Sequence, residues 1–295
     1  MTPSHSDAAA DSTPVPGWVA WLFAITGILI TVTLALGSTV CATDASASCP
    51  NWPGCYVGRL SPQAHTQPVV EFVHRVISSS IGLFGLASVV AGWLHRRRNR
   101  MLVVLPLVAL LGALASGVFG MMTIRWGINK FEAALDLLAA LISMGAIWRA
   151  WFVARRPDSR WHWNARSRLG AAAVGTLVAG HFLAVLVSGS GSLSRCMGWA
   201  LFVRGAGDGP LVAWGLQQAV MVVGELLTVA VLVARLRHRV SAWDLLLAIL
   251  VVVVLATGIL ISAAGAQEGL DVAHAVGTVL ILALVMTGTM RDSVN

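Results

Sequence analysis

Eight long apolar segments limit what this chain can fold into. A bilayer core is about 30 Å thick, so a helix needs about 20 apolar residues to cross it. Only helices and closed barrels satisfy their backbone hydrogen bonds in lipid, and segments of this length are helices. The sequence therefore predicts an all-α integral membrane protein with eight transmembrane helices, over residues 17–40, 69–94, 101–122, 132–153, 169–190, 211–234, 242–263 and 270–290.

Charged residues are few and lie mainly between the apolar segments. Only 11% of the 295 residues are charged, against about a quarter in soluble domains. The net charge of +7 comes from Arg residues that gather in segments 95–100, 149–168 and 235–239. Short basic loops mark the cytoplasmic side of a membrane, so the charge requires no nucleic-acid partner. We predict a multi-pass protein of the plasma membrane, surrounded by the lipid bilayer, with both termini in the cytoplasm.

The eight segments divide into two related halves. The tripeptide ASG at 115–117 is echoed by ATG at 256–258, and each precedes a short loop and a helix with a polar residue in its first turns, Asp136 or His274. This repeat predicts two pseudo-symmetric four-helix bundles. The predicted divisions are a disordered cytoplasmic tail (1–16), the N-terminal half (17–154), a cytoplasmic linker (155–168), the C-terminal half (169–290) and a second cytoplasmic tail (291–295).

A motif of cysteine, proline and tryptophan lies between the first two segments. It reads CPNWPGC from Cys49 to Cys55, and the second apolar segment then opens with EFVHR from Glu71 to Arg75. Glu71 and His74 are three residues apart and share one face of a helix. Ionisable residues at the rim of a membrane span are costly and indicate a functional site. The two cysteines are close enough to form a disulfide outside the cell, where disulfides persist.

Two further cysteines, Cys41 and Cys196, fall in the two long outer loops. Four cysteines allow three pairings, and the sequence leaves open whether Cys196 pairs with Cys41 or stays free. A zinc site is not predicted, because no cluster of His or Cys completes a ligand set around Cys49 and Cys55.

The Cys-Pro-x-Trp-Pro-x-Cys loop followed by Glu-x-x-His-Arg resembles the haem A synthase family of bacterial membrane proteins. The resemblance implies oxidation of the C8 methyl group of haem O to the formyl group of haem A, which supplies terminal oxidases. Haem O is then the substrate of the N-terminal half, and haem b is a cofactor of the C-terminal half. Haem O synthase and terminal oxidase assembly factors are the protein partners that the resemblance implies.

The resemblance assigns haem chemistry to several residues of the N-terminal half. Glu71 is expected as the acid or base of the oxidation and His74 as an iron ligand or active-site base. Their structural alternatives are a helix-start carboxylate and a histidine bonded to a neighbouring helix. Asp136 stands where the family has a second histidine, and it either ligates iron weakly, holds a proton or pairs with Arg75 or Arg125. Arg75 is also expected to bind a haem propionate, since guanidinium binds carboxylates in bidentate fashion, with anchoring at the membrane interface as the alternative.

The C-terminal half retains one of the implied histidines, His274, which is expected to be an axial ligand of haem iron. Gln217 and Gln218 stand where the family has its partner, and they are included as haem contacts, with interhelical hydrogen bonding as the structural alternative. His181 is expected to be a packed polar residue, and Glu225 has no evident role. Two alternative functions stay open: a family member that binds haem or assists oxidase assembly without catalysis, and a small membrane transporter.

Overall fold

The computed structural model describes residues 15–158, 161–189, 192–204, 207–237 and 240–293. Within these ranges eight α-helices are long and apolar enough to cross a membrane, which confirms the predicted all-α, multi-pass architecture. Most of the predicted tail 1–16 and the last two residues of the tail 291–295 lie outside the described residues. The helices are α1 (Gly17–Ala42), α2 (Thr66–Leu94), α3 (Met101–Trp126), α4 (Lys130–Arg155), α5 (Ala165–Val187), α6 (Leu211–Leu236), α7 (Ala242–Ala264) and α8 (Glu268–Asp292), with short 3-10 helices η1 (Ala45–Ser48) and η2 (Leu193–Cys196).

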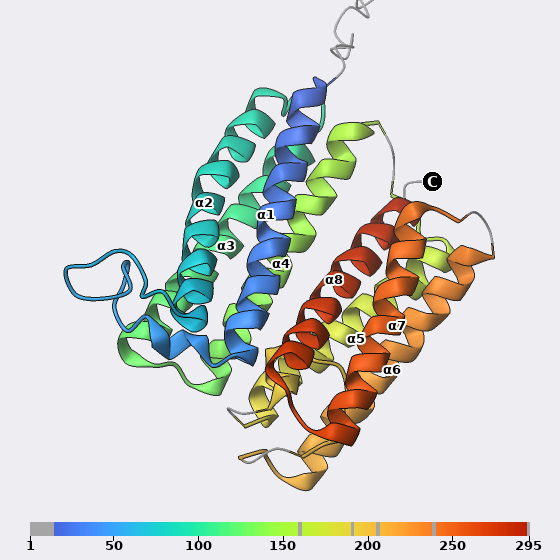
Figure 1. The fold of residues 1–295 in the computed structure, drawn as a ribbon. Coiled ribbons are helices and arrows are strands. Elements are labelled where there is room, and N and C mark those ends of the chain that lie inside the picture. The colour runs from blue at the N-terminus through green and yellow to red at the C-terminus, as the bar shows by residue number, and fades with distance from the viewer. Residues whose placement is uncertain (1–14, 159–160, 190–191, 205–206, 238–239, 294–295) are drawn as a thin grey trace, which may run out of the picture.

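The helices form two groups of four that lie side by side (Figure 1). In the N-terminal group, α1 and α3 each pack on both α2 and α4, which closes a ring. In the C-terminal group, α5 packs on α6 and α8, and α7 packs on α8. The groups meet where α1 contacts α8, α4 contacts α5 and α4 contacts α8. Exchanging the two halves converts the α1–α8 contact into the α4–α5 contact and leaves the α4–α8 contact unchanged, so the packing follows the predicted pseudo-twofold arrangement.

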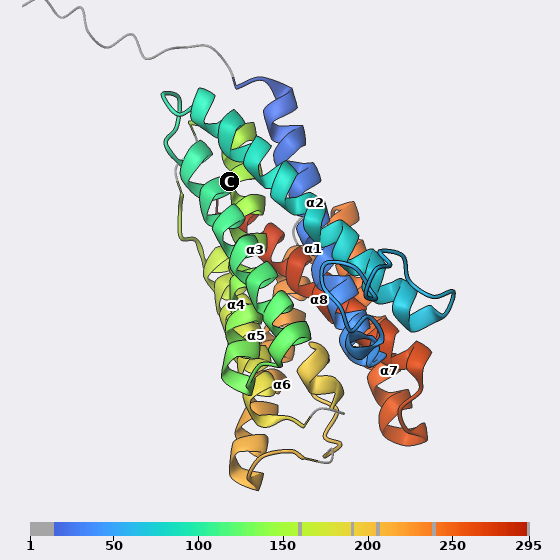
Figure 2. The same cartoon turned by 90° about the vertical axis from the view of Figure 1, so that its left-hand side faces the viewer.

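One pair of helices departs from this symmetry. α2 and α3 pack closely, whereas their counterparts α6 and α7 touch far less. The loops at this end differ as well. The loop that follows α1 projects from the end of the N-terminal bundle in both views (Figures 1 and 2), while the loop that follows α5 is partly buried.

All four cysteines lie at one end of the bundles, called here the disulfide end. Cys49 pairs with Cys55, as predicted, and Cys41 pairs with Cys196. The second disulfide answers the question that the sequence left open. It joins the end of α1 to η2, and so links the two halves covalently. The described chain begins and ends at the opposite end, the termini end (Figure 1).

Ion pairs fasten α6 and α7 to α8 at the termini end. Arg235 of α6 donates to Asp292 over 3.1 Å, and the two side chains are only 4% and 8% exposed. Arg291 of α8 lies 3.2 Å from Asp244 of α7. The carboxylate of Asp244 also accepts a hydrogen bond from Ser241, the N-cap residue of α7. The last turn of α8 is therefore an anchor for both of its neighbours.

Removing the arginine of the buried pair should destabilise the protein. Arg235→Met leaves the Asp292 carboxylate buried without its closest partner, so the free energy of unfolding should fall by roughly 3 kcal/mol. The control is Asp158→Asn, which breaks a pair with Arg98 in which Asp158 is 74% exposed and should cost less than about 1 kcal/mol. Thermal unfolding in detergent measures both variants, and equal losses would contradict the assigned role of Arg235.

Candidate functional site

The first turns of α2 carry a buried ion pair at the disulfide end. Glu71 is 4% exposed, and its Oε1 accepts a hydrogen bond from Nε of Arg75 over 2.7 Å. The two residues are one helical turn apart, which is the spacing that brings side chains together on a helix surface. A carboxylate inside a span needs such a partner. Glu71 is therefore not a solvated carboxylate at a helix start.

Arg75 also holds the first loop against α2. Its Nη1 donates to the carbonyls of Asn51 (2.5 Å) and Gly54 (3.2 Å), and its Nη2 donates to the carbonyl of Cys49 (2.7 Å). These three carbonyls belong to the loop that the Cys49–Cys55 disulfide closes. A single guanidinium therefore connects Glu71 to the cysteine motif. The expected contact of Arg75 with a haem propionate stays a prediction.

His74 lies beside α1, one turn from Glu71. A Cβ atom added at Gly37 of α1 would lie 3.4 Å from Cε1 of the His74 ring, so the absence of a side chain there makes room for the imidazole. Among the described residues, the buried Nδ1 of His74 has no hydrogen-bond partner. Buried polar atoms are normally paired. An imidazole with an unpaired nitrogen is suited to bind a ligand or to accept a proton.

Asp136 of α4 is bonded to the facing helix. Ser116 of α3 donates from Oγ to Oδ1 of Asp136 over 2.5 Å. The suggested ion pairs of Asp136 with Arg75 or Arg125 are not formed within the described part of the chain. The carboxylate is thus oriented by a hydroxyl group, and its role as a weak iron ligand or proton holder stays a prediction.

The C-terminal half contains the corresponding contact. Thr257 Oγ1 of α7 lies 3.1 Å from Nδ1 of His274 in α8. The hydroxyl residue of each repeated tripeptide, Ser116 or Thr257, therefore contacts the polar residue of the next helix. The glycines that follow the two hydroxyl residues have different surroundings. A Cβ atom added at Gly117 would meet nothing within 4 Å in the described structure, whereas one added at Gly258 would lie 3.2 Å from His274 and 3.3 Å from Leu201.

Both ring nitrogens of His274 are engaged. The side chain is 1% exposed, and its Nε2 accepts a hydrogen bond from the backbone N–H of Trp199 over 3.1 Å. Its Nδ1 lies 3.1 Å from the carbonyl of Val254, which can only accept a hydrogen bond. Nδ1 therefore carries the proton, and the lone pair on Nε2 is directed at the Trp199 amide.

The glutamines of α6 do not supply a partner to His274. Nε2 of Gln218 donates to Oε1 of Gln217 over 2.9 Å. This bond lies within α6, whereas the structural alternative expected from the sequence was hydrogen bonding between helices. Within the described ranges, the other polar atoms of both amides and both ring nitrogens of His181 have no partner. As they lie, His274, Gln217 and Gln218 offer haem iron no free imidazole lone pair, because Nε2 of His274 accepts the Trp199 N–H and Nδ1 carries the proton. The haem contacts expected of Gln217, Gln218 and His274 stay predictions.

Sequence reasoning missed two residues of this half, Trp199 and Glu225. Oε1 of Glu225 accepts a hydrogen bond from the backbone N–H of Ala200 over 2.8 Å, which gives this glutamate the partner that a carboxylate inside a span requires. The sequence did contain a signal for Glu225, because a glutamate inside an apolar segment requires a hydrogen-bond donor. No donor was assigned to it from the sequence. The sequence offered no comparable signal for Trp199.

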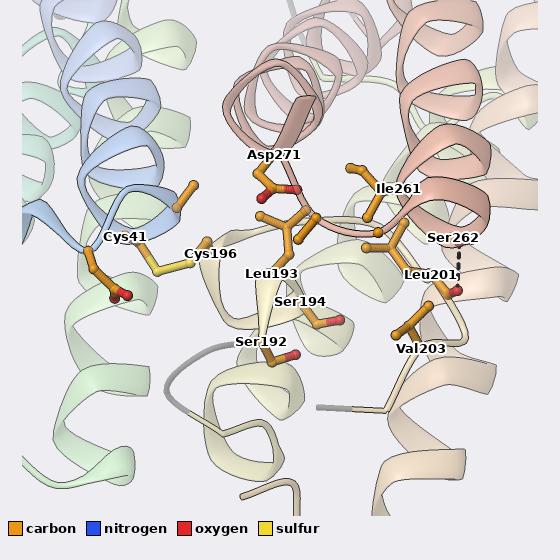
Figure 3. A pocket seen from close by; sticks show the side chains of 14 residues that line it. Cys41, Ser192, Leu193, Ser194, Cys196, Leu201, Val203, Ile261, Ser262 and Asp271 are labelled. Atoms are coloured by element: carbon orange, nitrogen blue, oxygen red, sulfur yellow. Dashed lines mark hydrogen bonds between the residues drawn. A yellow bond between two sulfur atoms is a disulfide. The ribbon is translucent and has the colours of Figure 1, made fainter. Parts of the chain in front are cut away.

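A cavity of about 240 Å³ lies between the two halves at the disulfide end. Figure 3 shows the Cys41–Cys196 disulfide, Leu193 and Asp271 among the side chains that line this cavity. Small-molecule sites usually measure about 300–1,000 Å³, and neither Glu71 nor His74 lines this cavity. We therefore do not assign the candidate site to it.

The fold and the site define a polytopic membrane protein in which a buried Glu–Arg pair and a histidine lie together at one rim of a four-helix bundle. The chain belongs to the COX15-CtaA family of cytochrome oxidase assembly proteins, whose family model matches residues 20–206. This match confirms the resemblance that the cysteine motif indicated. The matched range contains most of α1, all of α2 to α5, and Trp199 in the loop that follows α5.

Curated relatives named Heme A synthase are similar to part of the chain. The protein from Lysinibacillus sphaericus is 28% identical over 132 residues, which cover 44% of this chain and 43% of the relative. The protein from Geobacillus thermodenitrificans is 28% identical over 131 residues (43% and 40%), and that from Bacillus mycoides is 23% identical over 131 residues (44% and 42%). Each similarity therefore spans less than half of the relative's length.

Replacing Arg75 should loosen the first loop. Arg75→Gln removes donors to three loop carbonyls, and hydrogen bonds from charged donors contribute about 1.5–3 kcal/mol each. Protease cleavage within residues 56–65 should therefore rise at least about tenfold. Glu71→Gln is the control, because it leaves these donors in place and should change cleavage less than about twofold. Limited proteolysis read by mass spectrometry tests this, and equal cleavage in both variants would refute the role of Arg75.

Proposed function

We propose that this protein oxidises the C8 methyl group of haem O toward the formyl group of haem A, and that it thereby serves the assembly of terminal oxidases. The observation that carries the proposal is the buried Glu71–Arg75 pair, one helical turn from a histidine with an unpaired ring nitrogen among the described residues. The name of the relatives and the description of the family support this reaction class. The substrate haem would bind in the N-terminal half.

Each of the three residues has a distinct role in this proposal. His74 binds the iron of the substrate, because neutral imidazole is a good axial ligand of haem iron. The conversion of the methyl to a formyl group takes one oxygen atom from water and gives four electrons to an external electron acceptor. Glu71 accepts a proton that this oxidation releases, which is the role of a positioned general base. Arg75 holds the carboxylate by a charge-assisted hydrogen bond of 2.7 Å, the stronger kind of hydrogen bond. The disulfide-closed loop keeps Arg75 in place through its three carbonyls.

The setting of the reaction follows from the two ends of the molecule. We place the termini end in the cytoplasm, because the described residues of the Arg-rich segments 95–100, 149–168 and 235–239 lie there. Both disulfides then face the outer side of the plasma membrane, where they persist. Haem O synthase is the proposed source of the substrate, and oxidase assembly factors are the proposed recipients of the product.

A second candidate function is haem binding in support of oxidase assembly, without oxidation. The observation that favours it is the bond between Ser116 and Asp136. The resemblance implies a histidine at position 136, and an aspartate bonded by a serine hydroxyl does not replace a second axial imidazole. In this case the protein takes up haem through His74 and releases it unchanged.

The test is haem A production in a bacterial strain that lacks its own synthase. The wild-type chain should restore haem A, and Glu71→Gln should lower it at least about 100-fold with accumulation of haem O, since general acid–base catalysis contributes about 10²–10⁴ in rate. Glu268→Gln is the control, because Glu268 is an exposed carboxylate at the start of α8. Chromatography of the extracted haems gives the readout.

Two other results would change the assignment. Unchanged haem A in Glu71→Gln would remove Glu71 from the reaction. Haem bound by the wild-type chain, with no haem A formed, would favour the second candidate function.

A further inference from the structure

The loop that follows α5 turns back into the C-terminal bundle. We call residues 193–201 of this loop the re-entrant segment. Trp199 is 2% exposed and has the largest of the fully buried side chains in the described structure. Glu225, which accepts the Ala200 N–H, lies about four turns from the disulfide end of α6. Its side chain leans toward the start of the helix, but the contact is still deep within the span.

Irregular backbone at membrane depth is tolerated only where the protein satisfies its polar groups. Two helices accept hydrogen bonds from the backbone of the re-entrant segment. The N–H of Trp199 donates to Nε2 of His274 in α8, and the N–H of Ala200 donates to Oε1 of Glu225 in α6. His274 and Glu225 therefore act as acceptors for two N–H groups that lie outside any helix.

Two carbonyls of the segment accept hydrogen bonds from hydroxyl groups. Thr278 of α8 donates to the carbonyl of Met197, and Ser262 of α7 donates to the carbonyl of Leu201 over 3.1 Å. Together with Glu225 of α6, these contacts reach three of the four helices of the C-terminal bundle. The segment thus bridges α6 and α7, which explains why these two helices touch so much less than α2 and α3.

Local chain features hold the segment in this position. The Cys41–Cys196 disulfide fixes its middle to the end of α1. Two residues later, a Cβ atom added at Gly198 would lie 2.9 Å from the carbonyl oxygen of Leu193 and 3.3 Å from Cδ2 of His274. A glycine is therefore needed where the backbone passes closest to the histidine.

The N-terminal half has no equivalent insertion among its described residues. Arg75 holds the first loop at the disulfide end. Nδ1 of His74 keeps no partner there, and no atom of the described chain approaches a Cβ added at Gly117. At the matching tripeptides, Leu201 of the re-entrant segment lies 3.3 Å from a Cβ added at Gly258, whereas no atom of the described chain lies within 4 Å of one added at Gly117.

We infer that the re-entrant segment takes the place of a haem in the C-terminal bundle, with His274 acting as a positioning residue for the Trp199 amide. The chain then binds a single haem, in the N-terminal half. The exclusion of haem from the C-terminal half stands on the contacts above, and only the location of the single haem rests on the proposed function.

The test is a titration of the purified full-length protein in detergent with iron protoporphyrin IX, followed by absorption. The wild-type chain should take up one equivalent, and His74→Leu should lose it. His274→Gln should keep it with an unchanged spectrum, because an amide oxygen still accepts the Trp199 N–H. Uptake of two equivalents by the wild-type chain, or loss of an equivalent in His274→Gln, would overturn the inference without any further variant.

A matched pair of variants separates positioning from iron ligation. His274→Leu leaves the Trp199 N–H without an acceptor, so it should unfold at a clearly lower temperature than His274→Gln, while both keep the single haem. A ligand role for His274 would instead remove the same haem from both variants. If the wild-type chain takes up no haem at all, the proposed site at His74 fails, while the exclusion of haem from the C-terminal half is upheld.

Discussion

A bilayer offers no hydrogen-bond partners to a polypeptide, and this constraint governs the molecule beyond its eight helices. Several charged or irregular elements inside the spans are matched by another part of the same chain. Arg75 joins Glu71 to three loop carbonyls, and Glu225 meets the amide of a returning loop. Near the opposite end, Arg235 and Asp292 neutralise each other between two helices. The polar residues therefore connect elements that apolar packing alone would leave free to slide.

The two halves share one arrangement of helices but differ in what surrounds it. Ser116 with Asp136 and Thr257 with His274 occupy matching places between neighbouring helices. Around them, one bundle keeps its loop at the surface, and the other draws its loop inward. A duplicated scaffold can diverge in this way because most helix–helix contacts are kept in both halves, and the α6–α7 pair loosens most, where the loop lies between its helices. We therefore regard the N-terminal half as the reactive half and the C-terminal half as its support.

The helices could be predicted from the sequence because a membrane span is a local signal: about 20 apolar residues bounded by polar ones. The Glu71–His74 spacing and the Cys49–Cys55 pair are local in the same sense. The partner of Cys196 and the burial of Trp199 are not, since each depends on residues far away in the chain, Cys41 in one case and His274 in the other. Asp136 shows the intermediate case: its helix and depth followed from the repeat, but its hydroxyl partner required the structure.

The disulfide between the halves also affects the order in which the protein can be completed. Cys41 and Cys196 are 155 residues apart, and at 5–20 residues per second the ribosome needs roughly 8–30 s to add the second after the first. During this interval the nascent chain carries Cys41 as a spare thiol close to Cys49 and Cys55, with its proper partner not yet made. Early formation of the Cys49–Cys55 disulfide therefore favours correct pairing, because it leaves Cys41 as the one free thiol until Cys196 has been synthesised.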